Sequence, residues 1–387
     1  MIAPTAYLLI VCAYLFLVTC AAYAFRKKTR PDAPLVPFAL VMPAHNESDQ
    51  IDAILADAAR LDYPKDLYVV FVIADNCTDD TADRARAAGA VVHERHDPDL
   101  RGKGPALDWF LRAAREQLES FDAVAFVDAD MRIDPRFLRE LSGALAFEDR
   151  QVVQASNGVA RPEANWRAAL GYLGFSVINH VRPAGRDALG GTAELRGSGM
   201  AFRTRLLLEY GWPAHSLAED IEFSRRLLLD DILVHYNPHA RVVSELATRR
   251  AQATVQQARW EGGKLDLFKR YFPTVLRRAL RTRHWRYIDA ALDMLVPPLS
   301  LLVMSILITG LVSLLVHPVW TAVVALCAVA VAWCVLSGLI LCRAPLRVWL
   351  YLAAVPVFIV WKGALFLSLI VRRGPQAWQR TPRDREL

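Results

Sequence analysis

The sequence predicts an α/β domain with a mainly parallel sheet, preceded by one apolar helix and followed by two or three more. Two observations predict this fold class. Short apolar runs alternate with helical patterns between residue 35 and about residue 265, and long apolar stretches lie on both sides of that region. The hydrophobic share of 54% is high for a soluble protein because these outer stretches raise it.

Residues 6–25 form the first apolar stretch, which is long enough to span a bilayer. Arg26, Lys27, Lys28 and Arg30 follow at once, whereas a signal peptide carries its charges before the apolar core. We therefore expect residues 1–30 to be a retained membrane anchor. By the positive-inside rule, the amino terminus lies outside and the next domain lies in the cytoplasm.

The middle of the chain, residues 31–263, reads as one catalytic domain. We expect buried strands at residues 38–42, 68–74, 91–94, 123–127 and 151–155, and helices at residues 49–59, 80–88, 105–118 and 135–146. Sheets built in this way bind ligands beyond the carboxyl ends of their strands. The residues that follow the strands are therefore the first candidates for a site.

In residues 264–290, Lys and Arg alternate with apolar residues, and the apolar residues recur at helical spacing. This pattern favours an amphipathic helix, or a pair of helices broken at Pro273, on an anionic membrane surface; a solvated surface helix is the alternative. Residues 291–372 hold two or three transmembrane helices, the last interrupted by Pro356 and Lys362, and residues 373–387 form a basic tail. That last stretch either spans the membrane or returns the tail to the cytoplasm.

The net charge and the cysteines limit the kinds of partner and site that the protein is expected to have. The net charge of +6 lies beside apolar segments and no recognition motif appears, so a membrane surface is favoured over nucleic acid as the partner. None of the six cysteines forms a CxxC pair, which argues against a zinc site or a disulfide framework. A reduced, cytoplasmic domain fits.

The fourth expected strand runs into Asp128-Ala129-Asp130. Carboxylates at positions i and i+2 of an extended chain point the same way, so Asp128 and Asp130 would hold one hard cation. Mg²⁺ or Mn²⁺ suits such ligands together with phosphate oxygens. Solvated acids in a loop are the alternative, because this short pattern is common.

Other polar residues follow the first two strands and open the third helix. The first strand ends near Pro43 and Glu47, and the second ends at Asp75, which would accept hydrogen bonds from a base or ribose. Lys103 lies in a glycine-flanked segment before a helix, an anion site in principle. Asn46 and Thr78 have helix capping as an equally good role.

Three further segments lie downstream. Gly197-Ser198-Gly199 would let a ligand approach the backbone. Glu219 and Asp220 open a helix, where an acid would serve as a general base or simply favour the helix terminus. Gln256, Arg259 and Trp260 share one helix face, where Arg would grip a diphosphate and Trp would stack on a sugar, although a core aromatic beside a surface Arg has the same pattern.

Taken in order from residue 38 to residue 260, these motifs resemble the membrane-bound family 2 glycosyltransferases of the inverting GT-A type. The resemblance implies that Pro43, Glu47, Asp75, Lys103, Asp128 and Arg259 bind a UDP-sugar, with Asp130 and Asp128 at a Mg²⁺ or Mn²⁺ ion. It implies that Asp220 is the catalytic base, and that Gly197, Ser198, Gly199, Glu219, Gln256 and Trp260 bind the acceptor. In the tail, Trp378, Arg380 and Thr381 look similar to elements that cover the bound nucleotide.

The resemblance also bears on the acceptor. Synthases that secrete a polymer generally have more transmembrane helices than this chain, so we expect transfer to a lipid-linked acceptor, either a polyprenyl-diphosphate oligosaccharide or a glycolipid. A processive synthase of a β-linked polysaccharide is the alternative, and a nucleotidyltransferase or a non-enzymatic transporter or scaffold is more remote. The expected location is a bacterial cytoplasmic membrane, with several spans and partner proteins of a polysaccharide pathway.

Overall fold

The computed structural model describes residues 1–26, 30, 32–244, 250–359, 361 and 363, and within this set the side chains of residues 250–261 are left out. The chain divides into two compact units, although we expected residues 31–263 to be one domain. The sheet unit comprises residues 26–160 and 192–245, and the helical unit comprises residues 1–25, 161–191 and 246–387. Residues 161–191 therefore interrupt the sheet unit in sequence and pack with the terminal segments instead.

The sheet unit contains an eight-stranded sheet in the order β3-β2-β1-β4-β7-β6-β8-β5. Its four strands β3, β2, β1 and β4 are parallel, as are β6 and β8, while β7 and β5 run antiparallel to their neighbours. The mainly parallel sheet is thus confirmed, but the sequence did not reveal β5, β7 and β8. The strands are β1 Phe38–Ala44, β2 Tyr68–Asp75, β3 Val91–Arg95, β4 Ala123–Phe126, β5 Met131–Ile133, β6 Val152–Val159, β7 Met200–Arg203 and β8 Val234–Ser244.

Helices cover both faces of this sheet. Successive side chains of a strand point to opposite faces, and in these strands the side chains on each face are mostly apolar. On one face, Phe38, Leu40 and Met42 of β1 join a core with the apolar sides of α2 and α6. On the other, Phe71 packs edge-on against Phe110 of α4, and Phe126, Phe202, Trp212 and Phe223 form an aromatic cluster with α10. The helices are α2 Ile51–Ala59, η1 Lys65–Leu67, α3 Thr81–Ala87, α4 Lys103–Ala113, α5 Arg115–Leu118, α6 Phe137–Leu145, α9 Thr204–Tyr210 and α10 Glu219–Leu229. The single helix expected at residues 105–118 is two helices that meet at Ala114.

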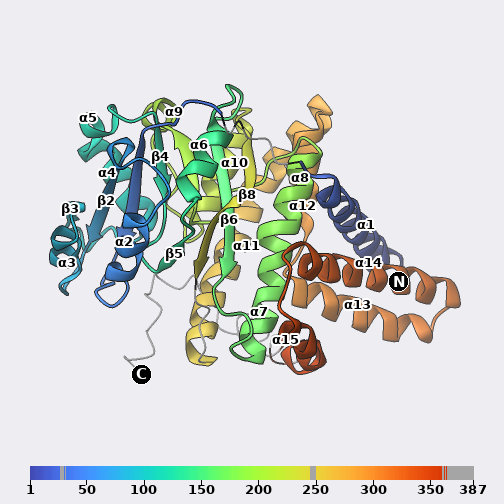
Figure 1. Ribbon diagram of the computed structural model, residues 1–387. Helices are drawn as coiled ribbons and strands as arrows, with labels where there is room; N and C mark the ends of the chain where they lie inside the picture. Colours follow the sequence, from blue (N-terminus) through green and yellow to red (C-terminus); the bar gives the residue numbers. More distant parts are fainter. Residues whose placement is uncertain (27–29, 31, 245–249, 360, 362, 364–387) are drawn as a thin grey trace. The chain divides into compact units, whose positions relative to one another are not determined.

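The helical unit is built around two long apolar helices. In Figure 1, α1 and α13 lie beside α14, and apolar side chains of all three form one buried cluster. The inserted residues 161–191 join them, since α7 packs Ala169, Leu170 and Leu173 on Leu339 and Val348. The helices are α1 Ile2–Ala24, α7 Trp166–Ser176, the π-helical turn η2 Val177–Val181, α8 Arg182–Ala188, α11 Arg250–Thr282, α12 Trp285–Leu295, α13 Leu299–Leu314, α14 Pro318–Leu341, α15 Leu346–Leu350 and η3 Tyr351–Ala354.

Two of the described helices, α1 and α14, are long and apolar enough to cross a membrane. The first of the spans expected within residues 291–372 is not one straight helix, because α12 and α13 meet at a bend of 70°. Pro297 and Pro298 lie at this bend, where proline removes backbone donors and cannot continue the preceding helix. Counted as one broken span, this pair makes a third. The last expected span begins as a shorter apolar helix at Leu346–Ile359, and most of its remainder lies outside the described residues.

The expected basic helix is longer than the sequence indicated. α11 runs unbroken from Arg250 to Thr282 and contains Pro273, so the alternative of two helices separated at this proline is wrong. Leu267, Tyr271, Val275 and Ala279 are buried at intervals of four residues along one side. The amphipathic pattern is therefore real, with a buried stripe and an opposite side that carries most of the charge.

A buried group of charged side chains joins three segments of the helical unit. Arg186 of α8 donates from Nε to Oδ2 of Asp289 at 2.9 Å and lies 3.0 Å from Oδ2 of Asp293. Arg182 donates to Oδ1 of Asp293, and the hydroxyl of Tyr14 in α1 donates to Oδ1 of Asp289 at 2.8 Å. Two arginines thus neutralise two aspartates at a point where α1, α8 and α12 meet.

Candidate functional site

The first two strands of the sheet unit end side by side, because Ala44 of β1 pairs with Ala74 of β2 in parallel register. Directly beyond them, Nδ1 of His45 donates to the carbonyl oxygen of Asp75 at 2.7 Å. Asn46 has a φ of +54°, and its Oδ1 accepts from the backbone N–H of Thr78 at 2.7 Å. Asn46 therefore joins the two loops that leave the sheet, a role that helix capping did not anticipate.

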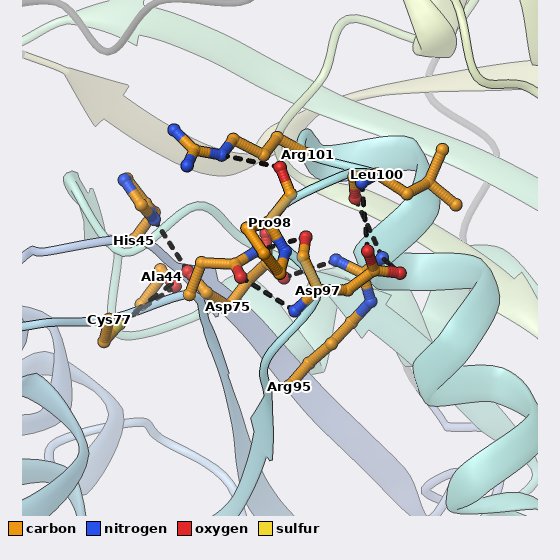
Figure 2. A network of polar contacts seen from close by, with 10 residues as sticks. Ala44, His45, Asp75, Cys77, Arg95, Asp97, Pro98, Leu100 and Arg101 are labelled. Atoms are coloured by element: carbon orange, nitrogen blue, oxygen red, sulfur yellow. Dashed lines mark hydrogen bonds and ion pairs between the residues drawn. The ribbon is translucent and has the colours of Figure 1, made fainter.

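Asp75 stands at the centre of a polar network that Figure 2 shows. Its Oδ1 accepts from Nη1 of Arg95 at 2.6 Å and from Nδ2 of Asn76 at 3.0 Å. Arg95 ends β3 and also donates from Nη2 to Asp97 and to the carbonyl oxygen of Leu100. Both of these contacts are made by Oδ1, so the network orients the carboxylate of Asp75 at the carboxyl ends of the strands. Asp75 is one of the residues expected to bind the nucleotide.

The aspartate pair 128–130 lies in a turn and not on an extended strand. β4 ends at Phe126, and Met131 already begins β5. The geometric reason given for the pair pointing the same way is therefore wrong. The two carboxylates are nevertheless close enough to affect one another, because the charge of Asp130 adds to burial in raising the pKa of Asp128, against the lowering effect of Lys103.

Lys103, the first residue of α4, reaches this turn. Its Nζ contacts Oδ1 of Asp128 and also donates to the carbonyl oxygen of Gly197. Burial opposes the charge of Lys103, but Asp128 and Glu219 outweigh it and raise the pKa of the ammonium group. The lysine thus stays charged among carboxylates from two different segments.

The Gly197-Ser198-Gly199 segment passes directly beside the same turn. Oγ of Ser198 accepts from the backbone N–H of Asp128 at 3.1 Å, and the N–H of Gly199 donates to the carbonyl oxygen of Phe126 at 2.9 Å. Gly197 and Gly199 have φ values of +78° and +72°, which favour glycine. A Cβ on Gly199 would also lie 2.9 Å from the Cβ of Ala155, so this backbone has no room for a side chain.

Glu219 and Asp220 occupy the first turn of α10 and complete the group. A Cβ built on Gly197 would lie 3.5 Å from Oδ2 of Asp220, so the acid faces the glycine segment. Burial, and then the charge of Asp220, raise the pKa of Glu219 to about 7, although Lys103 opposes this. Burial also raises the pKa of Asp220, while Lys103 and Arg196 act in the opposite direction. A carboxyl with a pKa near neutrality is suited to take up and release protons at working pH.

The amino-acid sequence of the central part of the chain decides the family. Residues 34–263 match the family described as Glycosyltransferase like family 2. The chain belongs to this family. It is therefore a glycosyltransferase enzyme with a GT-A-type fold, as the motifs suggested.

The relatives of this glycosyltransferase include proteins named beta-monoglucosyldiacylglycerol synthase. The protein from Nostoc sp. is 28% identical over 284 residues, which cover 71% of this chain and 58% of the relative. The protein from Synechocystis sp. is 29% identical over 269 residues, which cover 66% of this chain and 52% of the relative. The chain thus spans a little over half the length of the curated relatives it matches.

Among solved structures, a mannosyltransferase from Pyrobaculum calidifontis, determined in complex with GDP-Man and Mn²⁺, has the same fold. The TM-score is 0.51 and the sequence identity is 18%, with 85% of this chain and 97% of that chain covered. At this identity the likeness concerns the arrangement of strands and helices alone.

The glycosyltransferase has a donor set that fits a hard divalent cation. No group of three or more His, Cys, Asp or Glu side chains in the described part of the chain encloses a metal by itself. Mg²⁺ is often held by one or two carboxylates together with substrate phosphates and water, so two aspartates are sufficient. Asp128 and Asp130 repel one another across the turn, and a cation between them would relieve that repulsion.

The structure brings together the expected residues Lys103, Asp128, Gly197, Ser198 and Asp220, and it places Glu219 beside them. Pro43 is joined to them because its carbonyl oxygen accepts from the N–H of Ala129 at 3.4 Å. Glu47 lies over α3, where its N–H donates to Oγ1 of Thr81. Gln256, Arg259 and Trp260 lie in α11, but their side chains are outside the described residues, as are Trp378, Arg380 and Thr381.

Sequence reasoning missed three residues of this glycosyltransferase that contact the expected site. Arg95 is the last residue of the short strand β3, and a charged residue at the carboxyl end of a parallel strand was a usable signal. Gln154 is a polar residue inside the buried strand β6, which also stands out. Ser224 gave no such signal, because a serine on an amphipathic helix is ordinary.

Proposed function

We propose that this glycosyltransferase transfers a sugar from a UDP-sugar to the hydroxyl group of a membrane lipid. The observation that carries the proposal is that the chain holding the Lys103, Asp128 and Asp220 group also contains two helices long and apolar enough to cross a membrane. The relatives named for diacylglycerol glycolipid synthesis support a glycolipid product over a polyprenyl-diphosphate oligosaccharide.

The proposed reaction is a single displacement. Asp220 takes the proton of the acceptor hydroxyl as its oxygen forms a bond to the anomeric carbon, and the bond from that carbon to the diphosphate breaks on the opposite side. An α-linked donor therefore gives a β-linked product, which agrees with the names of the relatives. Asp128 and Asp130 would hold a Mg²⁺ or Mn²⁺ ion, whose positive charge would stabilise the departing diphosphate.

The other residues of the site are assigned by their positions. Asp75, oriented by Arg95, accepts a hydrogen bond from the nucleotide base. Lys103 places a positive charge beside the diphosphate site. We assign Gly197, Ser198 and Glu219 to the acceptor, because Gly197 faces Asp220, Ser198 follows Gly197 and Glu219 precedes Asp220. Gln256, Arg259 and Trp260 remain proposed contacts on the sequence pattern alone.

We further propose that the protein resides in a bacterial cytoplasmic membrane with the sheet unit facing the cytoplasm. The four basic residues after α1 support this orientation by the positive-inside rule. A lipid acceptor and a soluble nucleotide-sugar then reach the enzyme from the bilayer and from the cytoplasm respectively.

The test uses the purified full chain with a panel of UDP-sugars and vesicles that contain either diacylglycerol or polyprenyl-linked oligosaccharide. We expect a glycosylated diacylglycerol with a β linkage, identified by mass and by glycosidase sensitivity. In parallel, Asp220→Asn should lose transfer while UDP affinity stays close to that of the wild type. A water-soluble polymer would favour a processive synthase, and UDP release without any lipid product would contradict the lipid acceptor.

A further inference from the structure

The strongest link between the donor and acceptor sides of the site is the short loop of residues 194–199. On one side it contacts the donor group, because Ser198 accepts from the N–H of Asp128 and Gly197 accepts from Lys103. On the other side it faces Asp220, which lies against Gly197. The same six residues therefore touch both the proposed metal-binding turn and the proposed base.

Gln154 of β6 holds the end of this loop that faces the donor. The side chain is fully buried, and its Oε1 accepts from the N–H of Arg196 at 2.8 Å. Its Nε2 donates to the carbonyl oxygens of Ser198 at 2.8 Å and of Gly199 at 3.4 Å. One buried amide thus holds three backbone groups, of Arg196, Ser198 and Gly199, in a segment whose glycines would otherwise leave it free to move.

Ser224 of α10 holds the other end of the loop against the acidic turn. Its Oγ accepts from the N–H of Leu195 at 2.7 Å and donates to the carbonyl oxygen of Asp220 at 3.0 Å. Ser224 is 1% exposed, so water does not replace these bonds when they are lost. The hydroxyl therefore ties the turn that carries Asp220 directly to the loop.

An ion pair strengthens the same connection. Oε1 of Glu194 contacts Nη2 of Arg225 in α10, and Oε2 of Glu194 lies 3.1 Å from Nη1 of Arg196. Glu194 has a φ of +66°, a conformation that non-glycine residues rarely adopt without support from their surroundings. The loop is thus a constrained structure with anchors on β6 and on α10.

We propose that Gln154 and Ser224 are positioning residues that set the distance between the donor-side carboxylate Asp128 and the base Asp220. This inference rests on the function proposed above. Gln154 acts through Ser198 on Asp128, so its loss weakens the binding of the nucleotide. Ser224 acts on the Asp220 turn, so its loss slows the displacement and leaves nucleotide binding intact.

The test compares Ser224→Ala with Ser142→Ala in the full chain. Ser142 of α6 is a matched control because it is 2% exposed and its Oγ also accepts a buried backbone N–H, that of Val36, at 3.0 Å. Thermal unfolding should report similar losses of stability for the two variants. We expect Ser224→Ala alone to lower kcat by about ten-fold to 100-fold with unchanged UDP affinity, because small misplacements of reacting groups are costly.

Gln154→Met should differ from Ser224→Ala in its kinetics. We expect it to raise KM for the nucleotide-sugar and to weaken UDP binding. Slow hydrolysis of the nucleotide-sugar by water is measured beside lipid transfer, so the comparison does not depend on the acceptor. If the wild-type protein hydrolyses the nucleotide-sugar but transfers no sugar to lipid, the result counts against the proposed function and not against the positioning role. Equal kcat values for Ser224→Ala and Ser142→Ala, or unchanged UDP affinity in Gln154→Met, would overturn the positioning role.

Discussion

Nη1 of Arg95 lies 2.6 Å from Oδ1 of Asp75, and both side chains are almost fully buried at the ends of neighbouring parallel strands. Burial of such a pair is costly unless the charges neutralise one another and further hydrogen bonds satisfy the remaining atoms. Here Asn76, Asp97 and the carbonyl oxygen of Leu100 provide those bonds. The pair therefore supports the two strand ends, and we propose that it also holds Asp75 ready for a ligand.

Arg95→Met should weaken UDP binding. Without Arg95, Oδ1 of Asp75 loses the guanidinium group that orients it, so the carboxylate becomes a poorer acceptor for the nucleotide base. We expect a loss of about ten-fold or more, since a hydrogen bond to a charged group is worth about 1.5–3 kcal/mol. Calorimetric titration with UDP measures the effect. Arg84→Met is the matched control, because Arg84 pairs with Asp52 and Asp80 on the exposed surface; equal affinities in the two variants would refute the role of Arg95.

Removal of divalent cations should abolish sugar transfer, and Mn²⁺ or Mg²⁺ should restore it. Asp130→Ala should raise the cation concentration needed for half-maximal activity, because one of two carboxylate ligands is lost. Asp134→Ala serves as the control, since Asp134 lies four residues further on and its Oδ1 accepts from the N–H of Arg136. Activity that persists after dialysis against EDTA would exclude the proposed metal role.

Glu219→Gln should stabilise the protein at neutral pH. The folded-state pKa of Glu219 is about 7, above its ordinary value of 4.5, so the folded protein binds the proton more tightly than the unfolded chain. Stability contributed by the protonated form is complete below about pH 4.5 and is lost as the pH rises toward 7. The variant does not ionise, so its melting temperature should exceed that of the wild type by a few degrees at pH 8 and match it at pH 4.5. Measurements are made in EDTA without nucleotide, and a pH-independent difference would contradict the assignment.

Arg186→Met should destabilise the helical unit strongly. The substitution leaves Asp289 and Asp293 buried with less positive charge nearby, and breaking a buried pair in this way costs about 3–5 kcal/mol. Thermal unfolding in detergent measures the loss. Arg205→Met is the control, because the Arg205 pair with Glu209 is on the surface and should contribute little. Similar melting temperatures for the two variants would show that the buried cluster is not a stabilising contact.

Much of the sheet unit could be predicted from local patterns. The parallel strands β1 to β4 are short apolar runs separated by helical segments, so period and length identified them. The strands β5 and β7 were missed because they are three and four residues long, and β8 because polar residues and Pro238 interrupt its apolar pattern. The bend at Pro297 and Pro298 was readable from the prolines, whereas α11 continues through Pro273.

The sequence by itself determined the family, the alternation of strands and helices, and the side chains that follow β1, β2 and β4. It determined these because motif spacing and hydrophobic period are local properties of the chain. Only the tertiary structure decided that Lys103 meets Asp128, that Arg95 orients Asp75, and that residues 161–191 pack with the terminal helices. These contacts join residues from separate segments, and their geometry depends on how buried polar groups find partners when the sheet and the helices pack.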